Sequence, residues 1–126
     1  MFDGRDLDEA ERLVGEWQAG FEERATRARD LAERLRALTA TARSEDDLVS
    51  VTIDSHGDIS DLALTEGIRD QPAAVTARAI LAAFRAARRS LAEAASAATD
   101  ETVGAESETG KAVIASYEMR IGAKDA

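Results

Sequence analysis

Apolar residues recur every three or four positions over the first third of the chain. This is the heptad spacing of a helical seam, and Asp6 with the acidic residues after it suits a helix start. The pattern predicts one long helix from about Leu7 to Leu38. The seam, which only Arg24 interrupts, consists of Leu7, Ala10, Val14, Trp17, Phe21, Ala28, Leu31, Leu35 and Leu38.

A seam of this length needs a partner to cover it, and one chain of this size offers only a single further long helix. We therefore expect Trp17 and Phe21 to be buried between subunits, or between elements of one chain. The seam and an apolar sheet face together predict a homodimer.

After the seam the apolar period changes from three or four residues to two. Thr39–Arg43 is short and rich in β-branched residues, and Leu48–Asp54 alternates, with Val49, Val51 and Ile53 on one face. Such alternation is typical of strands that are buried on one side. Two antiparallel strands joined by a turn are predicted here.

A hairpin and a third strand follow. Ser55-His56-Gly57 has the length of a three-residue hairpin loop, in which Gly57 suits the left-handed position. Ile59–Leu64 is the predicted third strand. The result is a three-stranded antiparallel meander with one apolar face that must be covered.

A second helix begins near Pro72, with Asp70 or Gln71 as its cap, and is predicted to run to about Ala98. Residues 99–126 are rich in Thr, Ser, Glu and Gly and are expected to be an acidic, mostly mobile tail. The apolar stripe of the helix is Ala73, Ala77, Ile80, Leu81, Phe84, Ala87, Leu91, Ala94 and Ala98.

These elements predict an α+β fold in the order long helix, three-stranded antiparallel meander, long helix. Residues 1–98 are expected to form one domain and residues 99–126 the tail. The side chains expected in the core or the dimer interface are Trp17, Phe21, Leu31, Leu35, Val49, Val51, Ile53 and Phe84.

Composition narrows the class of protein. The chain has 126 residues, no cysteine and a net charge of −9, so disulfides and thiolate chemistry are excluded. The first residues are acidic with no apolar run behind them, which predicts neither a signal peptide nor a membrane anchor and favours the cytoplasm.

Positive charge is confined to two segments. Residues 21–43 carry +2 and residues 71–98 carry +3, while the remaining segments are acidic. In the second helix Arg78, Arg85, Arg88 and Arg89 have almost no acidic neighbours, so this group is the preferred surface for phosphates. Arg27 and Arg34 in the first helix are weaker candidates, because Glu23 and Asp30 are spaced to pair with them.

Candidate catalytic chemistry is sparse. His56 is the only histidine, and a lone histidine in a hairpin loop with no cluster of further ligands does not have metal-binding spacing. No nucleophile, base and orienting group can be assembled, and the glycines form no phosphate loop. We expect no enzymatic activity, no metal and no cofactor.

The string Val49-Ser-Val-Thr-Ile-Asp-Ser-His-Gly57, followed by spaced Ile59, Leu62 and Leu64 and an Ala/Arg-rich helix, resembles the YbaB/EbfC family of bacterial nucleoid-associated proteins. The resemblance spans about residues 7–98. It implies a homodimer that binds double-stranded DNA, largely independently of sequence, with long helices projecting like the arms of tweezers. The family also has an actinobacterial branch associated with type VII secretion loci.

Two functions stay open at this point. The resemblance favours a nucleoid-associated DNA-binding homodimer in the cytoplasm. The net charge of −9 favours a scaffold of the same fold that meets a protein partner, for example an accessory factor linked to type VII secretion.

Overall fold

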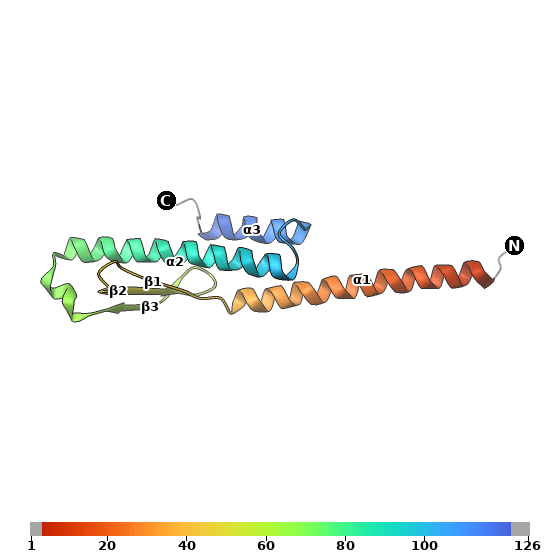
Figure 1. Ribbon diagram of the computed structural model, residues 1–126, viewed down its shortest axis with the longest axis horizontal. Helices are drawn as coiled ribbons and strands as arrows, with labels where there is room; N and C mark the ends of the chain where they lie inside the picture. The colour runs from red at the N-terminus through yellow and green to blue at the C-terminus, as the bar shows by residue number, and fades with distance from the viewer. Residues whose placement is uncertain (1–3, 122–126) are drawn as a thin grey trace.

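Two long helices, a three-stranded sheet and a shorter third helix form the protein in a computed structural model that describes residues 4–121 (Figure 1). The predicted α+β class and element order are confirmed, with one helix more than expected. The elements are α1 (Gly4–Arg36), β1 (Ala40–Arg43), β2 (Val49–Ile53), β3 (Ile59–Leu64), the 3-10 helix η1 (Glu66–Asp70), α2 (Ala73–Thr102) and α3 (Glu108–Ile121).

The sheet is the predicted meander, in the order β1-β2-β3 with both pairs antiparallel. On β2, Val49, Val51 and Ile53 are fully buried beneath α2, as expected. Gly57 has φ +88° in the hairpin loop, which confirms its predicted left-handed conformation. β3 spans the predicted Ile59–Leu64, while α1 ends at Arg36, two residues before the predicted end.

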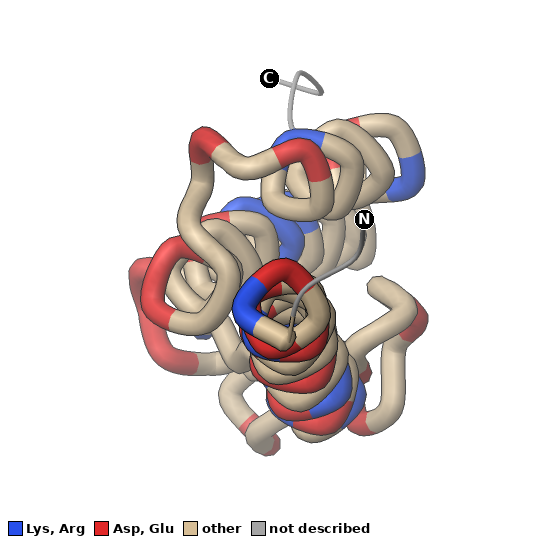
Figure 2. The backbone as a smooth tube through the Cα atoms, turned by 90° about the vertical axis from the view of Figure 1, so that its right-hand side faces the viewer, with Lys and Arg blue, Asp and Glu red and all other residues tan. Residues whose placement is uncertain are grey.

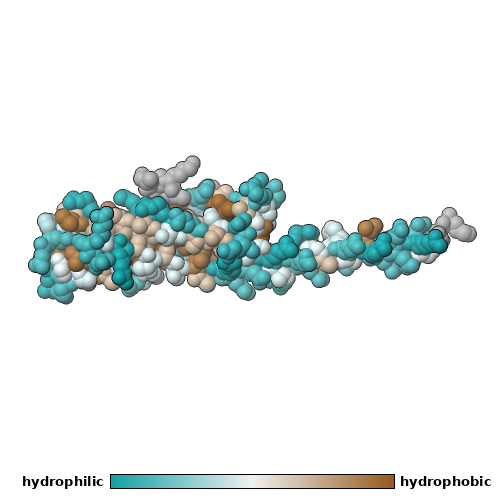
Figure 3. All heavy atoms as spheres, viewed as in Figure 1, coloured by the Kyte–Doolittle hydropathy of each residue, from teal (hydrophilic) through white to brown (hydrophobic). Residues whose placement is uncertain are grey.

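The first helix projects as a free arm. Only its C-terminal end packs on the rest of the chain: Leu31 is buried and Leu35 is partly buried against the core. From Gly4 to Asp30 every residue except Gly20 is exposed, and Figures 1 and 3 show this segment extending well beyond the other elements. We call residues 4–30 the arm.

The expectation that Trp17 and Phe21 are buried between elements of one chain is wrong. Their side chains are 66% and 58% exposed on the arm, with ring centroids stacked 6.0 Å apart. The physical reason is length, because a 33-residue helix extends far beyond the sheet and α2. Only burial between subunits stays open for this pair.

The buried face of α2 includes three positions of the predicted stripe, Ala87, Leu91 and Ala98, while other predicted positions are only partly buried or exposed. Phe84 is only partly buried and Leu81 is 50% exposed, so Phe84 lies at the edge of the core. Small side chains dominate the contact, and they let α2 lie close to the sheet and to α1. The buried positions are Ala83, Ala87, Leu91, Ala95, Ala98 and Thr99.

The segment predicted as a mobile tail is helical over most of its length. α2 continues past Ala98 to Thr102, and after Gly104 the chain turns back so that α3 lies along α2 (Figure 1). Tyr117 and Ile121 of α3 are buried and belong to the core. Residues 122–126 lie outside the described part of the chain.

The start of α2 also differs from the prediction. Pro72 is the N-cap residue and no side chain caps the helix, so neither Asp70 nor Gln71 does so. Gln71 instead donates from its side-chain amide to the Thr76 hydroxyl at 2.8 Å. Residues 66–70 form the short helix η1.

Candidate nucleic-acid interface

Three arginines of α2 are exposed on one side of that helix. Arg78, Arg85 and Arg89 all have exposed side chains and lie within about 40° of one another around the axis, at 100° per residue. Within residues 4–121, none of the three has an ion pair. We call this set the arginine row. It is a surface of uncompensated positive charge on a chain that is acidic overall.

The fourth arginine of the predicted group is oriented differently. Arg88 is half-buried at the junction of α2 and α3, where its guanidinium lies 5.2 Å from the Phe84 ring centroid. It also donates to the backbone carbonyl of Arg120 at 3.4 Å. This placement makes Arg88 a contact between α2 and α3, with its guanidinium partly occupied inside the chain.

Arg78 faces a groove of about 550 Å³ between α2 and the turn joining β1 to β2. Glu45 and Asp46 line the same groove. The Ser44 hydroxyl donates to Asp46 at 2.6 Å and the Leu48 amide donates at 3.1 Å, and these bonds lower the pKa of Asp46 below its usual 3.8. Because these carboxylates carry negative charge at neutral pH, Arg78 lies in a less positive field than Arg85 and Arg89.

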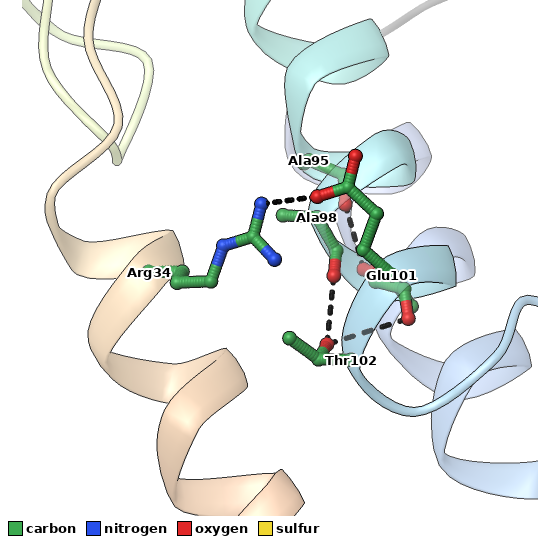
Figure 4. A network of polar contacts seen from close by, with 6 residues as sticks. Arg34, Ala95, Ala98, Glu101 and Thr102 are labelled. Carbon is green, nitrogen blue, oxygen red and sulfur yellow. Dashed lines mark hydrogen bonds and ion pairs between the residues drawn. The ribbon is translucent and has the colours of Figure 1, made fainter.

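The two candidate arginines of α1, Arg27 and Arg34, are each paired with a carboxylate of the same chain. Arg27 pairs with Glu23 at 3.6 Å, as predicted. Arg34 was expected to pair with Asp30, and the structure instead pairs it with Glu101 of α2 at 2.6 Å (Figure 4). Arg34 therefore joins the base of the arm to the end of α2.

His56 lies exposed in the hairpin loop. The Asp54 carboxylate accepts the backbone amides of His56 and Asp58, at 2.9 and 3.1 Å, so its role there is to order the turn. The His56 ring nitrogen is 4.0 Å from Asp54, with both side chains open to solvent. Within residues 4–121 no group of three or more potential ligands is close enough to hold a metal ion.

Reasoning from the sequence missed Tyr117 and Ile121, which place α3 against α2 and so enclose Arg88. The sequence did contain local signals for the end of α2 and the start of α3. Gly104 has φ +85° and its amide bonds back to the Thr99 carbonyl, a glycine stop after α2. The Ser107 hydroxyl accepts the Gly110 amide at 2.9 Å, an N-cap for a new helix.

The model of the YbaB/EbfC DNA-binding family matches residues 12–106. The chain belongs to the YbaB/EbfC DNA-binding family. No curated protein and no solved structure matches.

The YbaB/EbfC match covers most of α1, the whole sheet and all of α2, and it includes the arginine row. α3 lies beyond its last matched residue. The family is defined by DNA binding and is non-enzymatic. No helix among the described residues is both long enough and apolar enough to cross a membrane.

Proposed function

We propose that this YbaB/EbfC protein is a nucleoid-associated homodimer that binds double-stranded DNA through Arg85 and Arg89, with Arg78 beside them and with little dependence on base sequence. The observation that carries the proposal is the arginine row, which is exposed and has no ion pair among residues 4–121. Uncompensated arginines on a helix suit phosphates, because the guanidinium binds an oxyanion through two parallel hydrogen bonds.

The surface lacks the features of base readout. Direct readout requires an element that fits into the major groove and presents polar side chains to base edges. Arg85 and Arg89 are one helical turn apart and are flanked by alanine and Ser90 on the exposed side. Binding is therefore electrostatic and strongly weakened by salt.

We assign a smaller contribution to DNA binding than the sequence suggested to three of the candidate arginines, Arg88, Arg27 and Arg34. Each already has a contact inside the chain: Arg88 with Phe84 and Arg120, Arg27 with Glu23, and Arg34 with Glu101. An arginine that must first break such a contact gains less from binding a phosphate.

Two uncovered apolar surfaces support the homodimer. One is the Trp17–Phe21 pair on the arm. The other is on the sheet, where Ile59, Leu62 and Leu64 oppose the buried residues of β2 and so share their face, yet they are 43–48% exposed because α2 does not reach β3. Apolar surfaces of this kind mark sites of association.

A scaffold that meets a protein partner is the second candidate. The net charge of −9 and the exposed aromatic pair on an acidic arm favour it. Membership of the branch associated with type VII secretion would belong with this function, whereas the arginine row favours DNA.

A mobility-shift titration with duplex DNA at low and at moderate salt decides between the two functions. We expect retardation at low salt that is similar for unrelated duplexes and is lost as salt rises. If tens of micromolar protein retard no duplex at low salt, DNA binding is refuted for this chain and the scaffold function replaces it.

A further inference from the structure

The arm carries an apolar seam that no other part of residues 4–121 covers. Leu7, Val14, Trp17 and Phe21 are 49–66% exposed, and so is Leu13 beside the seam, at 62%. The arm is also acidic: residues 4–11 carry four carboxylates and one arginine, and Figure 2, which looks along α1 from its N-terminal end, shows these acidic positions in the first turns. A partner for this helix must offer both an apolar seam and less negative charge.

We propose that the arm pairs with the arm of a second copy of this chain as an antiparallel two-stranded coiled coil, centred between Val14 and Trp17. The inference rests on the self-association in the proposed function and names the contact that the arm makes. It does not depend on DNA binding.

The side-chain sizes along the seam are complementary in this register. In an antiparallel pair each first core position of a heptad faces the second core position of the partner. When the pair is centred between Val14 and Trp17, Ala10 faces the partner's Phe21 and Val14 faces the partner's Trp17. Each large ring then faces a small side chain, and twofold symmetry repeats both layers.

The positions flanking the seam also fit. Leu13 falls opposite the partner's Gly20, where the missing side chain leaves room for it. At the ends of the pair, Leu7 lies against the partner's Arg24, whose methylene stem covers it while the guanidinium stays in water. Arg24, the one polar residue in the seam, thus lies at the boundary of the paired segment.

Charge decides the direction of the two helices. Residues 4–11 carry a net −3, and residues 20–27 carry two arginines and two glutamates, a net charge of zero. Parallel pairing would place the two −3 segments side by side, whereas antiparallel pairing places each against a neutral segment with Arg27 opposite Asp6.

Neighbouring registers fit less well. A shift of one heptad in one direction places Trp17 against the partner's Phe21 and Val14 against the partner's Arg24. It also requires Leu31, which is 2% exposed and already packed in its own chain. A shift in the other direction leaves Phe21 without a facing residue on the seam, so the proposed register is the one that uses the whole uncovered segment.

The first test measures mass by light scattering on the full chain at micromolar concentration. Trp17→Ala with Phe21→Ala should halve the mass of the particle, while circular dichroism keeps the signal of the sheet and α2, because both side chains are exposed on the arm. Met119→Ala, which removes another exposed apolar side chain at 86% exposure, is the matched control and should leave the mass unchanged. An unchanged mass for the double variant would overturn the arm contact even if a homodimer persists through β3.

The second test reads direction by cross-linking, which is simple because the chain has no cysteine. Asp6→Cys and Arg27→Cys are prepared separately and treated with a short bis-maleimide. Antiparallel pairing predicts a cross-link only in the mixture of the two variants, since like positions lie about 32 Å apart at 1.5 Å per residue. Cross-linking within each variant alone would indicate parallel arms, and no cross-link in any sample would indicate unpaired arms.

DNA retardation by the wild-type chain, compared with the cross-linking result, separates the two hypotheses. If the arms cross-link as predicted but the wild type retards no duplex, DNA binding fails and the arm contact stands. If the wild type retards DNA and the arms do not cross-link, the arm contact fails and DNA binding stands.

Discussion

Replacing Arg85 and Arg89 together by glutamine is the sharpest perturbation of the proposed DNA surface. Both side chains are exposed and have no ion pair within residues 4–121, so their loss breaks no ion pair in that part of the chain. In a homodimer the double substitution removes four phosphate contacts. Each contact contributes about 0.9 to the slope of log affinity against log salt, so the slope should become shallower by about 3.6.

The assay is a binding titration at several salt concentrations, using a duplex labelled for anisotropy. Between about 50 and 200 mM salt, a slope difference of about 3.6 means that the wild type loses roughly 150-fold more affinity than the variant. The effect should be the same for unrelated duplex sequences, because phosphates carry no base identity.

A matched control removes the same charge from paired arginines. Arg27→Gln with Arg69→Gln deletes two arginines that already bind carboxylates, Glu23 at 3.6 Å and Glu66 at 2.8 Å. This control should change the slope much less than the Arg85 and Arg89 substitutions. Equal slopes for both double variants would refute the arginine row as the phosphate-binding surface. The row would then affect DNA binding only through the net charge of the protein.

The remaining predictions concern stability. Leu91→Ala, at a fully buried position, should destabilise by about 2–5 kcal/mol in urea unfolding, whereas Leu81→Ala, half-exposed on the same helix, should cost much less; similar costs would contradict the packing of α2. Gly110→Ala should cost about 1–3 kcal/mol, because a Cβ there would overlap the Gly104 carbonyl oxygen, and a near-neutral result would mean that α3 docks differently. The lowered pKa of Asp46 stabilises the fold above its unfolded value of 3.8, and this contribution is lost as the pH falls through the folded pKa. Asp46→Asn should thus lower the free energy of unfolding near neutral pH, and the difference from wild type should shrink in acid. A difference that does not change with pH would show that the charge of the Asp46 carboxylate is not its cause.

The arm shows the difference between local and tertiary information. The helix itself was predictable, because its seam and its acidic start are local patterns that act through helix geometry and the helix dipole. The seam did not reveal which part of it the chain covers. That depends on how far the sheet and α2 extend beside it, so Leu31 is buried while Trp17 is exposed.

The sheet was the most predictable part of the fold. Alternation along Val49–Ile53, the left-handed glycine at Gly57 and the strand Ile59–Leu64 each act over a few residues, so the sequence alone determined their structure. The uncovered face of β3 was not predictable, since α2 could cover two strands or three.

The partners of some candidate arginines could be predicted from the sequence, and the partners of others could not. Spacing along the helix correctly paired Glu23 with Arg27, because residues four apart are neighbours on any helix. The partners of Arg34 and Arg88, Glu101 and Arg120, are 67 and 32 residues away in the chain. Only the packing of α1 and α3 against α2 brings them together, so the sequence determined which residues carry positive charge and the tertiary structure decided which of these charges stay exposed to solvent.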